Sequence, residues 1–96
     1  MERIAADMNE ELMLDANAVA GLLFEVFGAE MTAADSECAH CGRAGEVGSL
    51  LAFTRAPGVV LRCPTCHEVM LRIVQTPRGT YIDARGAAHL RLQTAS

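Results

Sequence analysis

The chain has 96 residues and a net charge of −4, with 51% hydrophobic residues, no Trp, one Tyr and three Phe. This length suits one domain, and a domain so small is marginal by burial alone and often carries a covalent or metal staple. The charged start is not a signal peptide, and no apolar run approaches the ~18–20 residues that cross a bilayer. These features exclude a membrane protein and favour a cytoplasmic one, in which cysteines stay reduced.

The charge is divided unevenly along the chain. Residues 1–37 carry nine acids and one Arg, for a charge of −8, whereas residues 38–96 carry three acids and seven Arg, for +4. The net negative charge disfavours nucleic acid as a partner, and an unknown protein partner is expected instead. A basic face remains an alternative, with Phe53 and Tyr81 available for base stacking. The residues that would form it are Arg43, Arg55, Arg62, Arg72, Arg78, Arg85 and Arg91, with Arg62 and Arg72 pointing outward if their strands are adjacent.

Residues 1–13 are expected to be a polar, frayed lead-in, and residues 14–96 a single domain. A helix is predicted over residues 15–28, because Asp15 can cap its first turn and Gly28 stands at the C-cap position. Gly21 lies in its middle, where it either permits a close backbone approach or is merely tolerated. The apolar stripe of this helix consists of Val19, Leu22, Leu23, Val26 and Phe27, at three- and four-residue spacing.

After Cys41 the pattern changes to short strands separated by Pro and Gly turns. Within the third of these, residues 69–74 are apolar at nearly every position except Arg72, so both faces of that strand should be covered, one of them by the helix. The predicted strands are Leu50–Phe53, Val59–Arg62, Val69–Thr76, Thr80–Asp83 and Ala88–Leu92.

Two C-x-x-C units, Cys38–Cys41 and Cys63–Cys66, are separated by 21 residues. Each unit lets two thiolates of one tight turn point at the same ion, and a hairpin between the units would bring the turns together into a tetrahedral site. Gly42 suits a position with positive φ, and Pro64 presets the φ of its turn. Four thiolates fill the coordination of zinc, so the site is predicted to be structural, with no position for substrate.

Other chemistries of these cysteines stay open. The order C-x-x-C-G then C-P-x-C resembles rubredoxins, which hold one iron, but this chain lacks their aromatic rings and has His67 where their second turn carries Gly. A redox dithiol or disulfide pair is a further alternative. Replacement of a cysteine ligand by His40 or His67 is another alternative, but with four cysteines present both are expected to be exposed turn residues. His89, Glu68 and Asp83 have no partner at catalytic spacing.

Two resemblances extend this interpretation. Residues 38–76, with their four cysteines, Gly42 and Pro64, resemble the zinc-ribbon class, in which two knuckles hold a three-stranded antiparallel sheet. Most of the chain also resembles a family of short uncharacterised bacterial proteins, known only as a domain of unknown function. The segments that carry this second resemblance are residues 14–23 through Met31-Thr32, residues 38–42, and residues 57–64. It implies a fold and a metal site, and no activity.

We therefore predict a small α+β fold, in which an N-terminal helix packs on a four-cysteine zinc-ribbon antiparallel sheet, residues 38–76, with a C-terminal hairpin extension. Cys38, Cys41, Cys63 and Cys66 are predicted to bind one Zn²⁺. The expected function is that of a non-catalytic protein-interaction or adaptor module, with a homodimer through the helix stripe as one arrangement. The alternatives are a nucleic-acid-binding or transcription-associated zinc ribbon and a rubredoxin-like iron electron carrier.

Overall fold

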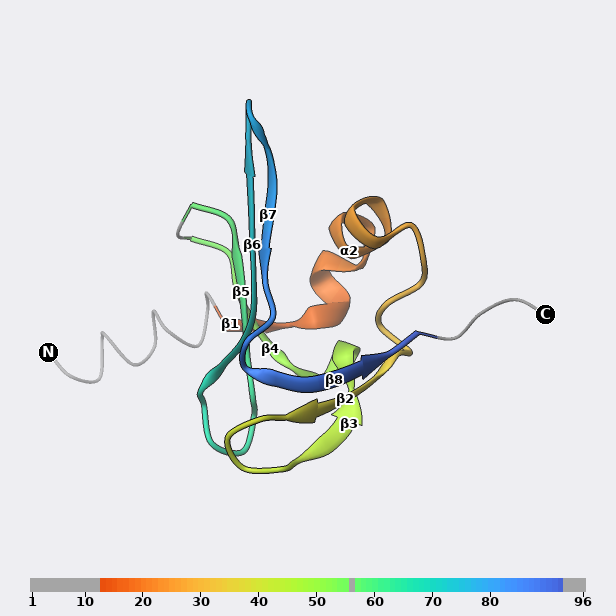
Figure 1. Cartoon of the computed structure of the whole chain (residues 1–96), viewed down its shortest axis with the longest axis vertical. Coiled ribbons are helices and arrows are strands. Elements are labelled where there is room, and N and C mark those ends of the chain that lie inside the picture. The colour runs from red at the N-terminus through yellow and green to blue at the C-terminus, as the bar shows by residue number, and fades with distance from the viewer. Residues whose placement is uncertain (1–12, 56, 93–96) are drawn as a thin grey trace, which may run out of the picture.

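The computed structural model describes residues 13–55 and 57–92, and it has one N-terminal helical segment and two antiparallel sheets (Figure 1). The predicted α+β class is thereby confirmed. The predicted lead-in, residues 1–13, lies outside the described residues except for Met13. Within the described part of the chain, no helix combines the length and the apolar character that crossing a membrane requires. The elements are β1 Met13–Asp15, η1 Ala16–Val19, α2 Ala20–Phe27, β2 Asp35–Cys38, β3 Ala44–Glu46, η2 Val47–Ser49, β4 Leu51–Phe53, β5 Val59–Arg62, β6 Val69–Thr76, β7 Gly79–Asp83 and β8 Ala87–Arg91.

The predicted helix is present with both of its caps. The Asp15 carboxylate accepts a hydrogen bond from the Asn17 amide at 3.1 Å. Gly28 ends the helix in the left-handed region, at φ 69°, and its amide donates to the Phe24 carbonyl. The first turns form a 3₁₀ helix, η1, which passes into α2 at Val19, whose φ of −113° and ψ of 25° are not helical. Gly21 is exposed and a Cβ there would meet no atom within 4 Å, so no close approach among the described residues requires a glycine.

The larger sheet, sheet A, has the strand order β1-β4-β5-β6-β7, with every pair antiparallel. The hairpin expected between the two C-x-x-C units is present as β4 and β5. β6 continues into β7 through a turn at Pro77 and Arg78, and the tip of this hairpin extends beyond the other strands of the sheet (Figure 1). The sheet is therefore wider than the three-stranded one that the zinc-ribbon resemblance implies.

The smaller sheet, sheet B, has the order β3-β2-β8, and the sequence analysis identified only its last strand. The predicted C-terminal hairpin extension is formed by β6 and β7, whereas β8 pairs with β2. The pairing of β8 with β2 takes the chain out of sheet A after β7. An ion pair between Arg91 and Asp35 joins β8 to β2.

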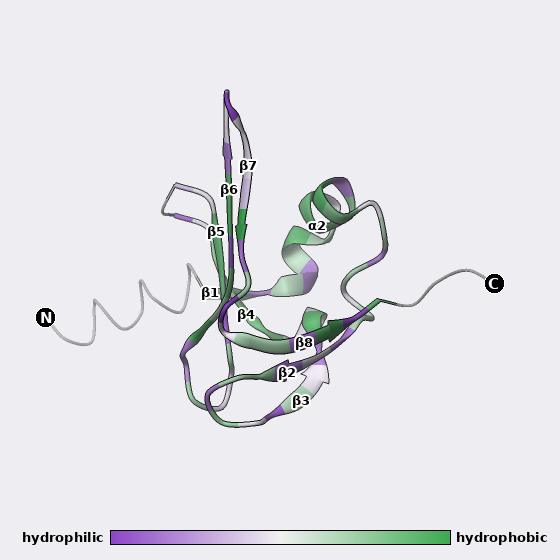
Figure 2. Ribbon diagram, in the orientation of Figure 1, coloured by the Kyte–Doolittle hydropathy of each residue, from purple (hydrophilic) through white to green (hydrophobic). Residues whose placement is uncertain are grey.

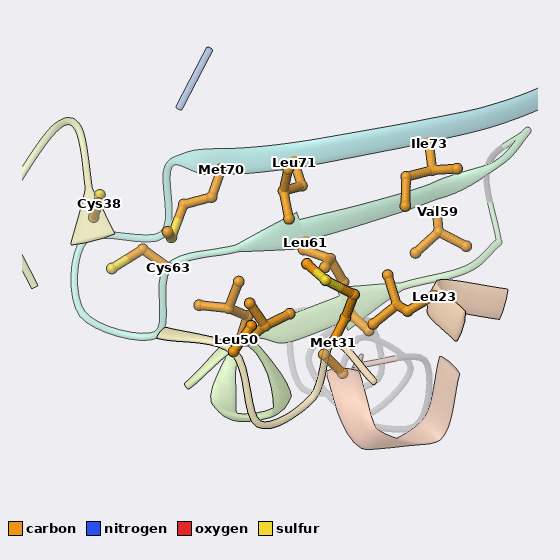
Figure 3. Close-up of a cluster of buried hydrophobic side chains, with 14 residues drawn as sticks. Leu23, Met31, Cys38, Leu50, Val59, Leu61, Cys63, Met70, Leu71 and Ile73 are labelled. Carbon is orange, nitrogen blue, oxygen red and sulfur yellow. The ribbon is translucent and has the colours of Figure 1, made fainter. Parts of the chain in front are cut away.

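The core lies between sheet A and the helical segment, with Cys63 near one end and Leu23 near the other (Figure 3). α2 is apolar around most of its surface (Figure 2), but its predicted stripe is turned toward this core. Leu23 is fully buried, while Val19, Leu22, Val26 and Phe27 are partly buried against the cluster. The stripe is thus used by the protein's own core, and Phe24 is the helix's exposed large apolar side chain, at 56%.

The opposite side of sheet A, here called the outer face, differs from our expectation that β6 is covered on both sides. Met70, Leu71 and Ile73 of β6 are buried, but Val69 and Val74 are half-buried and Arg72 is exposed. A register shift between Leu61 and Arg62 places two consecutive β6 residues in the core. Strand pairing and alternation place on the outer face the side chains of Leu51, Phe53, Val60, Arg62, Arg72, Val74, Tyr81 and Asp83.

Candidate metal centre

The two C-x-x-C units form two turns of the same geometry. Cys38 ends β2 and Cys41 lies in the turn toward β3, whereas Cys63 follows β5 and Cys66 lies in the turn toward β6. In each turn the residue after the second cysteine returns its amide to the carbonyl of the first. Gly42 donates to Cys38 at 2.9 Å, and His67 donates to Cys63 at 2.8 Å.

Both of these residues adopt a left-handed backbone. Gly42 has a φ of 80°, as expected, and His67 has a φ of 67°. Among the described residues, His67 is the one non-glycine residue with positive φ. Because the left-handed region costs a residue with a Cβ roughly 1–2 kcal/mol, the second turn retains strain that the first turn avoids.

The turns bring the four sulfur atoms into one cluster. All four lie within 4.8 Å of one another, and two of the separations are 3.6 Å for Cys38–Cys66 and 3.7 Å for Cys41–Cys63. A tetrahedral ion with Zn–S bonds of ~2.3 Å has S···S edges of about 3.8 Å, so these separations fit a single ion. They are far longer than the ~2.05 Å of a disulfide, and all four cysteines are free thiols. The cluster can therefore hold a metal ion.

Backbone amides surround the cluster with donors. The His40 amide donates to the Cys38 Sγ and the Thr65 amide to the Cys63 Sγ, each at 3.4 Å. At the other two cysteines, the Arg43 amide acts to lower the pKa of Cys41 and the Glu68 amide acts to lower that of Cys66. Each cysteine thus has a backbone amide, two residues later, that favours its thiolate form. Such donors reduce the negative charge on a thiolate and stabilise it as a metal ligand.

Without an ion, the cluster cannot ionise fully. Burial raises the pKa of Cys63, but the Cys66 and Thr65 amides and the neighbouring thiols outweigh it and lower that pKa to about 6. For Cys66, the Glu68 amide lowers the pKa, yet burial and the thiols of Cys38, Cys41 and Cys63 raise it overall to about 12. Ionisation of one cysteine is therefore favoured, and the negative charge of that thiolate opposes ionisation of a second. A divalent cation would remove this opposition, which suits the cluster to metal binding.

The cluster lies where the two sheets meet. Its first turn belongs to sheet B and its second to sheet A, and Cys38 and Cys63 are buried beside Met70 at one end of the core (Figure 3). Gly86 carries the chain from β7 to β8 beside this junction, and its carbonyl accepts a hydrogen bond from the Ala39 amide at 2.8 Å. A Cβ at Gly86 would lie 1.8 Å from the Val69 carbonyl oxygen. The sequence analysis predicted Pro and Gly turns between the strands but gave Gly86 no separate role.

The histidines and single carboxylates lie outside the cluster. His40 and His67 are exposed turn residues, as predicted, and neither contributes to the group of four sulfurs. The His89 side chain is 57% exposed and lies 3.9 Å from Glu37. Asp83 binds the Arg85 guanidinium, and this hydrogen bonding, with the Arg85 amide, lowers the Asp83 pKa to about 2.

Three of the seven arginines, Arg62, Arg72 and Arg85, lie around the outer face of sheet A, and the other four are dispersed. Arg62 and Arg72 lie on the outer face of adjacent strands, as anticipated, and Arg62 stacks over the Phe53 ring at 5.6 Å. Arg85 is paired with Asp83 and Arg91 with Asp35, so two of the seven are neutralised locally. The remaining three lie in separate loops, namely Arg43, Arg55 and Arg78.

Comparison with known proteins adds a family and no activity. No curated protein and no solved structure matches the chain. One family matches residues 8–95, which include all four cysteines and every described element. The chain therefore belongs to the family of unknown function DUF6510.

Proposed function

We propose that this protein is a non-catalytic, zinc-binding module in which one structural Zn²⁺ is held by Cys38, Cys41, Cys63 and Cys66. The observation that carries the proposal is the convergence of four sulfurs from two sheets at the spacing of a single tetrahedral ion. Tetrahedral thiolate sites hold zinc or iron, and the scarcity of aromatic rings argues against the rubredoxin-like iron alternative. Four thiolates leave no open position, so the metal would fasten sheet A to sheet B rather than activate water.

Native mass spectrometry of protein purified without chelator or added metal tests this assignment. One zinc per chain is the expected result. One iron per chain, with colour in the oxidised protein, would replace zinc by the electron-carrier alternative. A metal-free chain two or four daltons light would indicate disulfides and would contradict the metal site altogether.

Hydrogen exchange tests whether the metal is structural. Adding a chelator should raise amide exchange in β2 and β8 and at the start of β6, because these segments meet at the two turns. A protein that loses its metal while keeping its exchange pattern would refute a structural role.

As the second part of the proposal, the module acts by binding another protein in the cytoplasm, where its thiolates remain reduced. Support comes from Phe24, a large apolar side chain that α2 exposes outside the stripe that packs against the core. Exposed aromatic side chains are enriched at protein interfaces. A nucleic-acid interface has less support, because Arg85 and Arg91 are paired with Asp83 and Asp35 and three other arginines lie in separate loops.

A photo-crosslinking amino acid placed at position 24 tests this surface, with the same residue at the adjacent exposed position 25 as a control. Covalent adducts with one protein, formed at position 24 and weakly at position 25, would support a protein interface. Adducts with a second copy of the chain would identify it as a homodimer. Adducts with nucleic acid, or equal labelling at both positions, would contradict the proposal.

A further inference from the structure

The outer face of sheet A is a mixed apolar and basic surface. Its central row runs across four strands, through the paired positions Phe53, Val60, Arg72 and Asp83. Val74 and Tyr81 are paired beside this row. Asp83 binds Arg85 and is also the cross-strand neighbour of Arg72. Arg62, Arg72 and Arg85 outnumber Asp83 and the nearby Glu68, so the surface presents apolar side chains together with a net positive charge. A surface of this kind is complementary to a segment that carries both apolar and acidic side chains.

No element among residues 13–55 and 57–92 covers this face. The helical segment packs on the other side of the sheet, and the core cluster contains none of the outer-face residues. Tyr81 is 60% exposed. Two shallow hollows, of about 400 and 500 Å³, lie side by side here, and both are lined by Arg72, Asp83 and Arg85. Half-exposed apolar side chains around such hollows mark a surface that takes a partner.

The chain enters the structure at the beginning of the same row. Met13 of β1 is paired with Phe53 of β4, so residues 1–12 join the sheet at the edge of the outer face. Three strand spacings of ~4.8 Å separate β1 from β6, a distance of about 14 Å. Twelve residues span about 18 Å as a helix and up to about 40 Å when extended. Residues 1–12 are thus long enough to reach Arg72 in either conformation.

Residues 1–12 contain both acidic and apolar side chains, which complement the basic and apolar side chains of the outer face. Four acids and one Arg give the segment a charge of −3, and it also contains the apolar residues Ile4, Met8 and Leu12. Its acids are Glu2, Asp7, Glu10 and Glu11. Because the segment is tethered at the edge of the face, its effective concentration is of the order of mM, so even a weak contact would be occupied.

We propose that residues 1–12 bind in the same chain across the outer face of sheet A, with their apolar side chains on Val60 and Val74 and their carboxylates near Arg72. The contact rests on the geometry and charge of the sheet and requires neither the zinc nor the protein partner proposed above. A separate protein that uses the outer face would first have to displace this segment.

Amide NMR spectra of the full, metal-loaded chain test the contact. The variant Ile4→Ser/Met8→Ser removes the apolar side chains without changing the charge, and Asn9→Ser is the matched control in the same segment. The double variant should shift the amides of Val60, Arg72 and Val74 and leave α2 unchanged, while the control leaves both unchanged. Unshifted outer-face amides, or shifts centred on α2, would overturn the proposal.

Tyr81 supplies a second readout, because the chain has one Tyr and no Trp. Acrylamide quenching of its fluorescence should increase about twofold in the double variant and in the reciprocal variant Arg72→Gln. In the wild type it should also increase between 0.05 and 0.5 M salt, because salt screens exposed charges. Equal quenching in the wild type and in all variants would mean that residues 1–12 do not cover Tyr81, and would overturn the proposal. Protection that grows with protein concentration would assign the segment to a second copy and overturn binding in the same chain.

Discussion

Replacement of Cys41 by Ser separates metal binding from ordinary packing. Cys41 is exposed and lies outside the buried core, so a substitution there should change the free energy of unfolding by no more than about 0.5 kcal/mol if the thiol has no ligand role. If the thiol binds zinc, the variant loses one of four ligands. Structural zinc supplies roughly 10–16 kcal/mol to small domains, so one ligand corresponds to about 3 kcal/mol.

Thermal unfolding followed by circular dichroism measures this difference. A loss of about 3 kcal/mol lowers the Tm of a domain this size by roughly 12–24 °C. Thr65→Ser, at an exposed position in the second turn, is the control and should melt like the wild type. Adding a chelator should lower the Tm of the wild type toward that of Cys41→Ser. A Cys41→Ser protein that melts within about 4 °C of the wild type in zinc-containing buffer would refute the reasoning.

Three further predictions concern the junction and its turns. Gly86→Ala should lower the free energy of unfolding, measured in urea, by about 3 kcal/mol or more, because its Cβ would overlap a backbone carbonyl. Gly21→Ala is the control in open space and should raise the free energy of unfolding by about 0.5–1 kcal/mol. His67→Gly should stabilise the protein by about 0.5–1 kcal/mol in the same assay by relieving its left-handed backbone; a destabilised variant would contradict this. Zinc binding at pH 7.5 should release at least two protons, since the raised pKa values of Cys41 and Cys66 keep both thiols protonated without metal, and affinity should therefore fall as the pH falls. Calorimetry in buffers of different ionisation enthalpy measures this release, and fewer than about one proton would contradict it.

Local chemistry explains which elements the sequence revealed. Asp15 and Gly28 predicted the ends of the helical segment because a capping carboxylate and a left-handed glycine act within a few residues. Val59–Arg62 and Val69–Thr76 were predicted with the bounds that the structure has, since each is an apolar run bounded by turn residues. The cysteine spacing anticipated the sulfur cluster for the same reason, because each turn depends on only four residues.

What the sequence alone did not predict depends on contacts between distant segments. β2 has the sequence Asp-Ser-Glu-Cys, which contains no large apolar side chain and so gave no strand signal. Its alternation between half-buried and buried side chains arises only when β3 and β8 pair on either side of it. For the same reason the sequence did not reveal that β8 pairs with β2, after Gly86 carries the chain from one sheet to the other. The spacing of C-x-x-C units determined that four thiols could meet; the tertiary structure decided that their meeting point joins two sheets and that one face of the larger sheet stays open. Strand partners are chosen by long-range packing, which no local pattern records.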